Sequence, residues 1–490
     1  MNTHPLHEEP LSTPDQLGMP IPPSPHAVSM CLPRWEDVIG YEERDPATLH
    51  ALQLGYPRFL IHPYVQQLAN RLNPDPDRHA LPFPTEASAT HHRTYLLKHQ
   101  PDLPIDIVPS HSIHLVLFPP TAAALAKQGW QLLGEGLSSR HAEALLNQDP
   151  IPNPHPPADQ IRHQLATYTQ TDARNIYLFP SGMAALHAAL RALQTLHPGL
   201  GFAQFGFPYG DTLKLLEQLN KTPTRFYPYG DHQDLNHLKA DTTAQPIAGL
   251  FTEFPSNPLL ASVDLQPLRT LADTQPFPIV LDETLAACLN LNIHPFADIS
   301  AISLTKYFSG EGDAMGGALL LNPDRPHYPA LQTLLQQAEQ QTYCFGPDLQ
   351  QLHENAHDLP QRVEAINRNA LQIAEFLEEH PAIEHVWHPS LTDHETYDRY
   401  ARHENSYGGV LSFTLEFPEE NTIPFYDHFN VCKGPNLGTT YTLCCPFVML
   451  AHYHELDWAE DAGASRWLIR LSIGTEPAAE IIDRLERALT

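Results

Sequence analysis

The chain has 490 residues, too many for one ordinary hydrophobic core, so we expect two globular domains with additional segments. Its 57 acidic residues against 28 lysines and arginines give a formal net charge of −29, which argues against a nucleic-acid partner and against an anionic membrane surface. No apolar run approaches the roughly 18 residues of a membrane span, and the N-terminus lacks the features of a signal peptide, so a cytoplasmic protein is expected.

The cysteines and histidines give no metal pattern. The six cysteines are scattered and form no CxxC pair, which predicts reduced, buried thiols. The densest histidine groups, His91-His92 and His452-Tyr453-His454, have no carboxylate or cysteine framework beside them. We therefore predict no metal site.

The first 174 residues divide into three parts. Residues 1–24 are rich in proline and have little periodicity, which is typical of a disordered tail. Residues 25–72 have short apolar runs interrupted by Pro and Gly, as expected of an arm that lies on another surface. Residues 73–174 combine an apolar strand at 113–118 with several helical patterns and predict a folded α/β segment.

The rest of the chain predicts two domains. Over residues 175–355, short β-rich runs alternate with helical stretches, the pattern of a sheet covered by helices on both faces and our candidate catalytic core. Residues 356–490 open with a long amphipathic helix, since apolar residues recur there at steps of three and four. Strands at 409–416 and 468–473 and a final helix complete this second domain.

Lys306 is the most informative residue. It lies on an otherwise neutral, apolar strand and stands among small hydroxyl residues. Partial desolvation would lower the pKa of this lysine, so that it could bond an aldehyde cofactor and transfer protons; an exposed lysine at a strand end is the alternative. Ser303 and Thr305 occupy alternate strand positions, so we expect both to point to one face and bind a phosphate, with Lys306 on the other.

Two further strand ends complete the pattern. Asp282 closes the apolar strand 278–282, where a protonated pyridine nitrogen would neutralise it; a turn-capping aspartate is the alternative. Ser181 is suited to cap a helix whose first amides, those of Gly182 and Met183, would then be free for a phosphate. The lysine, the aspartate and the anion-binding helix start together predict pyridoxal 5'-phosphate.

Two more residues suggest contacts with a cofactor and a substrate. Tyr209 lies in a turn and could stack on a pyridine ring, or simply pack against its neighbours. Arg470 is a cation within an apolar strand. Either the carboxylate of an amino-acid substrate or an internal acidic residue would neutralise it.

Taken together, these segments resemble the Cys/Met-metabolism branch of the fold-type I pyridoxal phosphate enzymes, from about residue 20 to residue 490. The motifs occur in the family's order: Ser181-Gly182-Met183-Ala184-Ala185, Tyr209-Gly210-Asp211-Thr212, Glu253-Phe254-Pro255-Ser256-Asn257-Pro258, Leu281-Asp282-Glu283-Thr284, Ser303-Leu304-Thr305-Lys306 and Arg470-Leu471-Ser472-Ile473-Gly474. Within this branch the chain resembles the long fungal-type cystathionine γ-synthases. The motifs for this are less specific than those above and include Gly55-Tyr56-Pro57-Arg58-Phe59 and Cys445-Pro446-Phe447-Val448.

The resemblance implies an α/β fold, with a large mixed-sheet domain and a smaller C-terminal α/β domain. It implies that Lys306 binds the cofactor covalently, Asp282 pairs with the pyridine nitrogen and Tyr209 stacks on the ring. Arg470 would clamp the α-carboxylate of an amino-acid substrate, with Asn257 beside it and the cofactor's 3-oxygen. The phosphate would be held by a further set of residues: Gly182, Met183, Ser303 and Thr305.

The resemblance also implies an assembly. In the family, a Tyr-x-Arg pair near the N-terminus reaches the phosphate of the neighbouring subunit, and Tyr56-Pro57-Arg58 matches that pair. The arm at 25–72 is therefore expected to contact a neighbouring subunit in a homodimer or homotetramer.

Three departures from the family pattern bear on specificity. Segment 73–174 is an insertion relative to the short members, and Arg140 within it could be another phosphate ligand. Pro435 and Asn436 stand where many relatives have Glu and Ser, near the lysine. Asp211 stands where Gly is usual.

The implied activity is a γ-replacement that joins an O-acylhomoserine and cysteine to give cystathionine, a transsulfuration step in methionine biosynthesis. The alternatives are an O-acylhomoserine sulfhydrylase and a γ- or β-lyase acting on cystathionine or methionine. A non-catalytic regulatory subunit is the alternative from another class, although intact Lys306, Asp282 and Arg470 speak against it.

Overall fold

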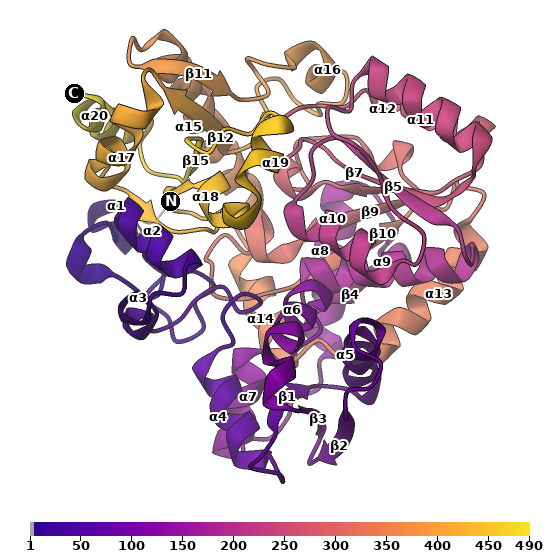
Figure 1. Ribbon diagram of the computed structural model, residues 1–490. Helices are drawn as coiled ribbons and strands as arrows, with labels where there is room; N and C mark the ends of the chain where they lie inside the picture. Colours follow the sequence, from indigo (N-terminus) through magenta and orange to yellow (C-terminus); the bar gives the residue numbers. More distant parts are fainter. Residues whose placement is uncertain (1–3) are drawn as a thin grey trace.

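The computed structural model describes residues 4–490 and contains three β-sheets covered by helices (Figure 1). The large sheet has seven strands in the order β4-β10-β9-β8-β7-β5-β6, and β10 is antiparallel to both of its neighbours. This is the mixed sheet that the resemblance implied. Its strands are β4 (Ile176–Phe179), β5 (Gly201–Phe205), β6 (Arg225–Tyr227), β7 (Ile247–Glu253), β8 (Ile279–Asp282), β9 (Ile299–Ser303) and β10 (Gly317–Leu321).

Helices cover both faces of this sheet, so strands such as β7 and β10 are buried along their whole length and are mainly apolar. The helices of this region are α9 (Gly182–Leu196), α10 (Gly210–Leu219), α11 (His232–Ala244), α12 (Leu265–Thr274), α13 (Tyr328–Gln341) and α14 (Gly346–Asn355). Five sheet strands, β5 to β9, run parallel, so their carboxyl ends meet at one edge. In such sheets ligands bind at that edge.

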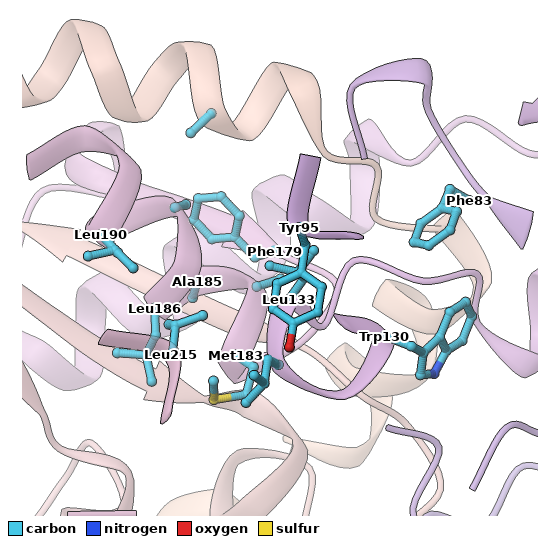
Figure 2. Close-up of a cluster of buried hydrophobic side chains, with 14 of the residues drawn as sticks. Phe83, Tyr95, Trp130, Leu133, Phe179, Met183, Ala185, Leu186, Leu190 and Leu215 are labelled. Carbon is cyan, nitrogen blue, oxygen red and sulfur yellow. The ribbon is translucent and has the colours of Figure 1, made fainter. Parts of the chain in front are cut away.

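The segment before the large sheet forms a smaller α/β unit. Strands β1 (His79–Phe83), β3 (Ile113–Phe118) and β2 (Asp106–Ser110) make an antiparallel sheet in that order. The helices of this unit are α4 (Pro63–Leu72), α5 (Glu86–His99), α6 (Ala123–Leu133), α7 (Ser139–Asn147) and α8 (His155–Thr169). The unit is not independent, because side chains such as Phe83, Tyr95 and Trp130 belong to the same apolar cluster as Met183 and Leu186 of α9 (Figure 2).

The C-terminal part forms a five-stranded sheet in the order β11-β12-β15-β14-β13. Its strands are β11 (Ile383–Trp387), β12 (Val410–Leu415), β13 (Cys432–Lys433), β14 (Leu443–Pro446) and β15 (Ile469–Ser472). Its helices are α15 (Leu359–Glu379), α16 (His394–Asp398), α17 (Pro418–His428), α18 (Phe447–Ala451), α19 (Leu456–Asp461) and α20 (Ala478–Leu489). The predicted apolar stripe of α15 is buried: Ala370, Ile373 and Leu377 pack in the cluster of this sheet, and Val363 and Ile366 pack in the cluster that includes Leu304 and Tyr307.

The N-terminal residues differ from the prediction of a disordered tail over residues 1–24. Residues 1–3 lie outside the described part, but from residue 4 onward the chain packs on the C-terminal domain. Leu6, Leu11 and Ile21 are buried in a cluster with Tyr441. The prolines interrupt periodicity, so the apolar residues between them gave no helical or strand pattern, yet each fills a site on a surface that forms only on folding.

The rest of the arm follows the same course. It carries α1 (Pro5–Glu8), α2 (Trp35–Glu42) and α3 (Pro46–Ala51). In Figure 1, α2 lies beside α17 and α18 of the C-terminal domain. None of the helices described over residues 4–490 has the length and apolar character needed to cross a membrane.

A buried arginine connects α15 to the turn that follows β9. Arg362 is 1% exposed and donates through Nη2 to the carbonyl oxygens of Tyr307 (2.9 Å) and Phe308 (3.1 Å). It also pairs with the Asp358 carboxylate. A side chain at Gly310 (φ +74°) would occupy the space of this guanidinium, so glycine is required there. The turn is thus fixed from the C-terminal domain.

We predict that Arg362→Ala lowers the free energy of unfolding by about 3 kcal/mol, because buried carbonyl and carboxylate oxygens lose their partner. Urea denaturation followed by circular dichroism measures the change. Arg487→Ala is the control: Arg487 makes an exposed pair with Asp483 and should change stability by at most about 0.5 kcal/mol. Equal effects of the two variants would contradict the assigned role of Arg362.

Candidate active site

A cavity of about 900 Å³ opens at the carboxyl edge of the large sheet. Strand ends, the N-terminal arm and the C-terminal domain all contribute to its walls. Among the predicted site residues, those that line it are Tyr56, Arg58, Gly182, Met183, Tyr209, Asn257, Asp282, Ser303, Lys306 and Arg470. Thr305 is absent from this lining. The structure therefore brings together side chains that are up to about 400 residues apart in the chain.

The start of α9 forms a cradle for an anion. Ser181 caps this helix, its Oγ accepting from the Ala184 amide at 3.1 Å and donating to the Gly134 carbonyl at 2.8 Å. The first helical amides have no partner within the helix and carry the positive end of its dipole. A Cβ at Gly182 would lie 3.0 Å from the Cβ of Ser303, so glycine keeps the cradle open. The cradle suits a phosphate.

Lys306 lies in the turn Leu304–Phe308, which begins where β9 ends and is kinked at Lys306 itself, whose backbone is not helical (φ −90°, ψ −125°). The prediction that Ser303 and Thr305 share a strand face, opposite Lys306, was wrong because the strand does not extend that far. Instead, Ser303 and Lys306 line the same cavity, whereas the Thr305 hydroxyl is buried and accepts from the Gly316 amide at 3.1 Å. Thr305 thus supports the turn rather than the cavity wall.

The amine of Lys306 is desolvated and has defined partners. Burial lowers the pKa of Lys306 below its ordinary value of 10.5. Nζ donates to Oδ1 of Asn436 at 2.6 Å and lies 4.7 Å from the centre of the Tyr56 ring. The lowered pKa increases the fraction of neutral, nucleophilic amine at a given pH.

Two carboxylates lie at neighbouring strand ends. Asp282 closes β8, and its Oδ1 accepts from the Thr284 amide at 2.9 Å. Burial raises the pKa of Asp282, which indicates that a cation is needed to balance its charge. Glu253 closes β7 and also lines the cavity; burial, together with the charge of Asp282, raises its pKa. Of the two, Asp282 was predicted as a site residue and Glu253 was not.

Arg58 and Tyr209 contact one another at the cavity wall. Arg58 donates through Nη2 to the Tyr209 hydroxyl at 2.6 Å and through Nη1 to Asp211 Oδ2 at 2.8 Å. Burial opposes the ionisation of Tyr56, but the charges of Lys306 and Arg58 outweigh it and lower the pKa of Tyr56. These contacts are those of the single chain that the structure describes, so the expectation that Tyr56 and Arg58 reach a neighbouring subunit stays a prediction.

Arg470 presents a different kind of guanidinium. It is 3% exposed and donates to Asn257 Oδ1 at 3.2 Å and to the carbonyl oxygens of Pro435 (3.0 Å) and Asn436 (3.2 Å). No aspartate or glutamate within residues 4–490 pairs with it, so the alternative of an internal salt bridge does not hold for this part of the chain. Its charge is available to an incoming carboxylate.

Arg140 was named as a possible phosphate ligand and does not reach the cavity. It donates to the Asp313 carbonyl at 2.7 Å and pairs with the Asp313 and Asp348 carboxylates at 3.3 Å. Asn436 and Asp211, which sequence reasoning noted only as departures, do contact site residues. Both residues could have been found from the sequence, because each is a polar residue that differs from the usual residue of the family at that position.

The segment 73–174 also contributes to a buried polar cluster behind α9. His91 and His187 contact the two oxygens of Glu135 at 2.7 and 2.9 Å. These three residues are of metal-ligand type. Glu135 is distant from His91 in the sequence, so the sequence did not indicate a carboxylate beside this histidine. Arg191 contacts His91 as well, so a cation already stands beside this cluster. The contacts form a hydrogen-bonded network in which Glu135 accepts from both rings.

The residues at the cavity fit pyridoxal 5'-phosphate. An amine that can bond an aldehyde, a carboxylate that can pair with a pyridine nitrogen and an anion cradle converge on one space. Tyr209 supplies an aromatic face beside them, and Arg470 supplies the cation for a substrate carboxylate.

Comparisons with known proteins identify the family of the chain. The chain matches two families, one described as Cys/Met metabolism PLP-dependent enzyme over residues 154–490 and one described as fungal trans-sulfuration enzyme, N-terminal domain, over residues 60–138. A cystathionine γ-synthase of Neurospora crassa is 32% identical over 97% of this chain and 98% of its own length. An L-2-amino-4-chloropent-4-enoate dechlorinase/desaturase of Streptantibioticus cattleyicolor is 30% identical over 93% and 95%, respectively.

Among solved structures, a cystathionine γ-synthase of Xanthomonas oryzae pv. oryzae in complex with cystathionine matches with a TM-score of 0.59 and 25% identity. The match covers 68% of this chain and 85% of that one and agrees with the fold-type I architecture. Pyridoxal 5'-phosphate is thus the cofactor, and the chain is an enzyme. It belongs to the Cys/Met-metabolism family of pyridoxal-phosphate-dependent enzymes.

Proposed function

We propose that this enzyme catalyses a γ-replacement in which an O-acylhomoserine and cysteine give cystathionine. The observation that carries the proposal is the position of Arg470: it lines the same cavity as Lys306, and Asn436 contacts both side chains. A carboxylate bound by Arg470 would bring the Cα of an amino acid close to the lysine amine. The similarity to a full-length cystathionine γ-synthase supports the choice of substrates.

In this proposal each side chain of the cavity has a defined role. When bound, pyridoxal 5'-phosphate supplies an electron sink that stabilises negative charge at the substrate Cα. Lys306 removes the Cα proton and moves a proton at Cβ; burial lowers the pKa of its amine, which raises the fraction of neutral amine at a given pH. Asp282 would hold the proton of the pyridine nitrogen, and Tyr209 would supply an aromatic face for the ring. The acyl group leaves from Cγ, and the cysteine sulfur bonds to that carbon.

Phosphate binding is assigned to the cradle at the start of α9. The amides of Gly182 and Met183 and the hydroxyl of Ser303 are its donors, with Arg58 as the nearby cation. Asn257 orients Arg470, because Oδ1 of Asn257 accepts a hydrogen bond from the guanidinium. The Thr305 hydroxyl is engaged with Gly316, so its contribution is to the shape of the turn.

The donor and the nucleophile are tested by incubating the purified enzyme with O-acetyl- or O-succinylhomoserine and either cysteine or sulfide. We expect cystathionine formation to exceed sulfide turnover by at least about tenfold in kcat/KM, which corresponds to about 1.4 kcal/mol. Turnover with sulfide alone would identify a sulfhydrylase, and elimination without a nucleophile would identify a lyase. A purified protein without the visible absorbance of lysine-bound cofactor, even after cofactor addition, would identify a non-catalytic subunit.

Arg470→Ala should reduce kcat/KM for the acylhomoserine at least about 30-fold, equivalent to about 2 kcal/mol, because the substrate carboxylate loses a charge-assisted partner. Most of the change should appear in KM, and the absorbance of the bound cofactor should persist. Arg466→Ala is the matched control, since Arg466 lies outside the cavity and pairs with Glu460. An unchanged KM in the Arg470 variant would contradict the proposed carboxylate site.

The pKa of Lys306 predicts how cofactor uptake depends on pH. The neutral amine reacts with the aldehyde, and burial lowers the pKa, so uptake by the apoenzyme should be half-maximal below pH 10.5. Asn436→Asp places a negative charge beside Nζ, which favours the ammonium form and should shift the profile to higher pH. Stopped-flow absorbance measures both profiles, with N-acetyllysine as the reference. A shift to lower pH in the variant would show that Asn436 does not contact the amine.

A further inference from the structure

Two carboxyl groups stand at neighbouring strand ends of the large sheet, and a pyridine ring offers a cation to only one of them. Glu253 is the last residue of β7 and Asp282 the last of β8, and the two are partners in the register of these parallel strands. Partner residues of a parallel pair point to the same face of a sheet, and both side chains line the cavity. The pyridine nitrogen carries one proton and can therefore balance one of these carboxylates.

Asp282 is the carboxyl group better suited to carry the charge. Its Oδ1 accepts from the Thr284 amide at 2.9 Å. Burial raises the pKa of Asp282, but hydrogen bonds from Thr284 oppose that rise. Such bonds favour the ionised form of a carboxyl group, which is the form that can pair with a protonated pyridine nitrogen.

Glu253 has a different environment. It is 7% exposed, and its Oε1 accepts from the Tyr209 amide at 2.5 Å. Within residues 4–490, its Oε2 has no hydrogen-bond partner and no lysine, arginine or histidine forms a salt bridge with it. Burial raises the pKa of Glu253 well above its ordinary value, the charge of Asp282 raises it further, and the Tyr209 amide opposes both. A buried carboxyl group without a cation is more stable with a proton bound.

The cations of the cavity are engaged elsewhere. The ionisable side chains around these strand ends include those of Tyr56, Arg58, Tyr209, Asp282, Lys306 and Arg470. Arg58 pairs with Asp211 at 2.8 Å, and the amine of Lys306 donates to Asn436 at 2.6 Å. Arg470 donates to amide and carbonyl oxygens only. Neither the strand ends nor the cavity wall supplies a partner for a second negative charge.

We propose that Glu253 is a positioning residue that works as a neutral acid: its Oε1 fixes the turn with Tyr209, and its bound proton leaves Asp282 as the single negative charge at these two strand ends. The pyridine ring then has one defined partner. A second carboxylate would compete for that partner and would cost free energy in a buried site. The proposal rests on the roles proposed above for Asp282 and Tyr209, but not on the proposed substrates.

Infrared difference spectroscopy tests the bound proton directly. The spectrum of the wild-type holoenzyme at neutral pH minus that of Glu253→Gln should contain the carbonyl band of a protonated carboxyl group, because the variant removes one such group. A carboxylate band in its place would show that Glu253 is ionised and would overturn the proposal. An unchanged cofactor affinity in Asp282→Asn would instead overturn the role proposed for Asp282, and the band would still decide the state of Glu253.

Cofactor affinity tests the positioning role without any substrate. Glu253→Gln keeps an uncharged acceptor for the Tyr209 amide, so the dissociation constant for pyridoxal 5'-phosphate should stay within about threefold of the wild-type value. Glu253→Ala removes the acceptor and should raise that constant at least about tenfold, with a changed visible circular dichroism of the bound cofactor, because the buried amide loses its partner. Glu416→Gln, at an exposed position outside the cavity, is the matched control and should leave the affinity unchanged.

The glutamine variant decides between the two states of Glu253. Equal losses of affinity in Glu253→Gln and Glu253→Ala would show that the negative charge of Glu253 is needed, which would overturn the proposal. If the alanine variant does not fold, a loss of about tenfold or more in Glu253→Gln alone would overturn it. Near wild-type affinity in Glu253→Gln, together with the band of a protonated carboxyl group, would support it.

Discussion

The whole site depends on the change of direction immediately after β9. The strand stops at Ser303, and a turn that is kinked at Lys306 brings this lysine into the cavity that Ser303 also lines. Two residues of the C-terminal part set this turn: Arg362 binds its carbonyl oxygens, and Asn436 accepts from the lysine amine. The position of the reactive amine is therefore a property of the contact between the two domains.

The two arginines of the cavity differ in whether an acidic residue of the chain balances their charge. Arg58 has an ionised partner, Asp211, so its charge is largely balanced within the chain. Arg470 is surrounded by amide and carbonyl oxygens, which bind a guanidinium without neutralising it. Only the second can gain a full charge partner from an incoming amino acid, because a carboxylate binds most strongly to a guanidinium that has no other anion.

The inserted segment has a role that its sequence did not reveal. Its helical and strand patterns predicted a folded α/β unit, and the structure contains one, but it shares a core with α9 rather than forming a core of its own (Figure 2). As a result, α6 lies close enough for Trp130 and Gln131 to bind the arm. A sequence pattern reports which face of a helix is apolar; it does not report which surface will cover that face.

Much of the fold and of the site followed from local sequence. The alternation of strands and helices, the stripe of α15 and the strands near 410 and 470 were predicted because each depends on periodicity within a short window. Lys306, Asp282 and Arg470 were predicted because burying an ionisable side chain in an apolar strand costs free energy unless a partner balances its charge. Such a residue therefore suggests a bound cofactor or substrate. Three features depended on contacts between distant segments: the packing of residues 4–24, the orientation of Thr305 and the contacts of Arg58 with Asp211 and Gln131. Only the tertiary structure decided them, since the energy of each comes from a partner surface that exists only after the chain has folded.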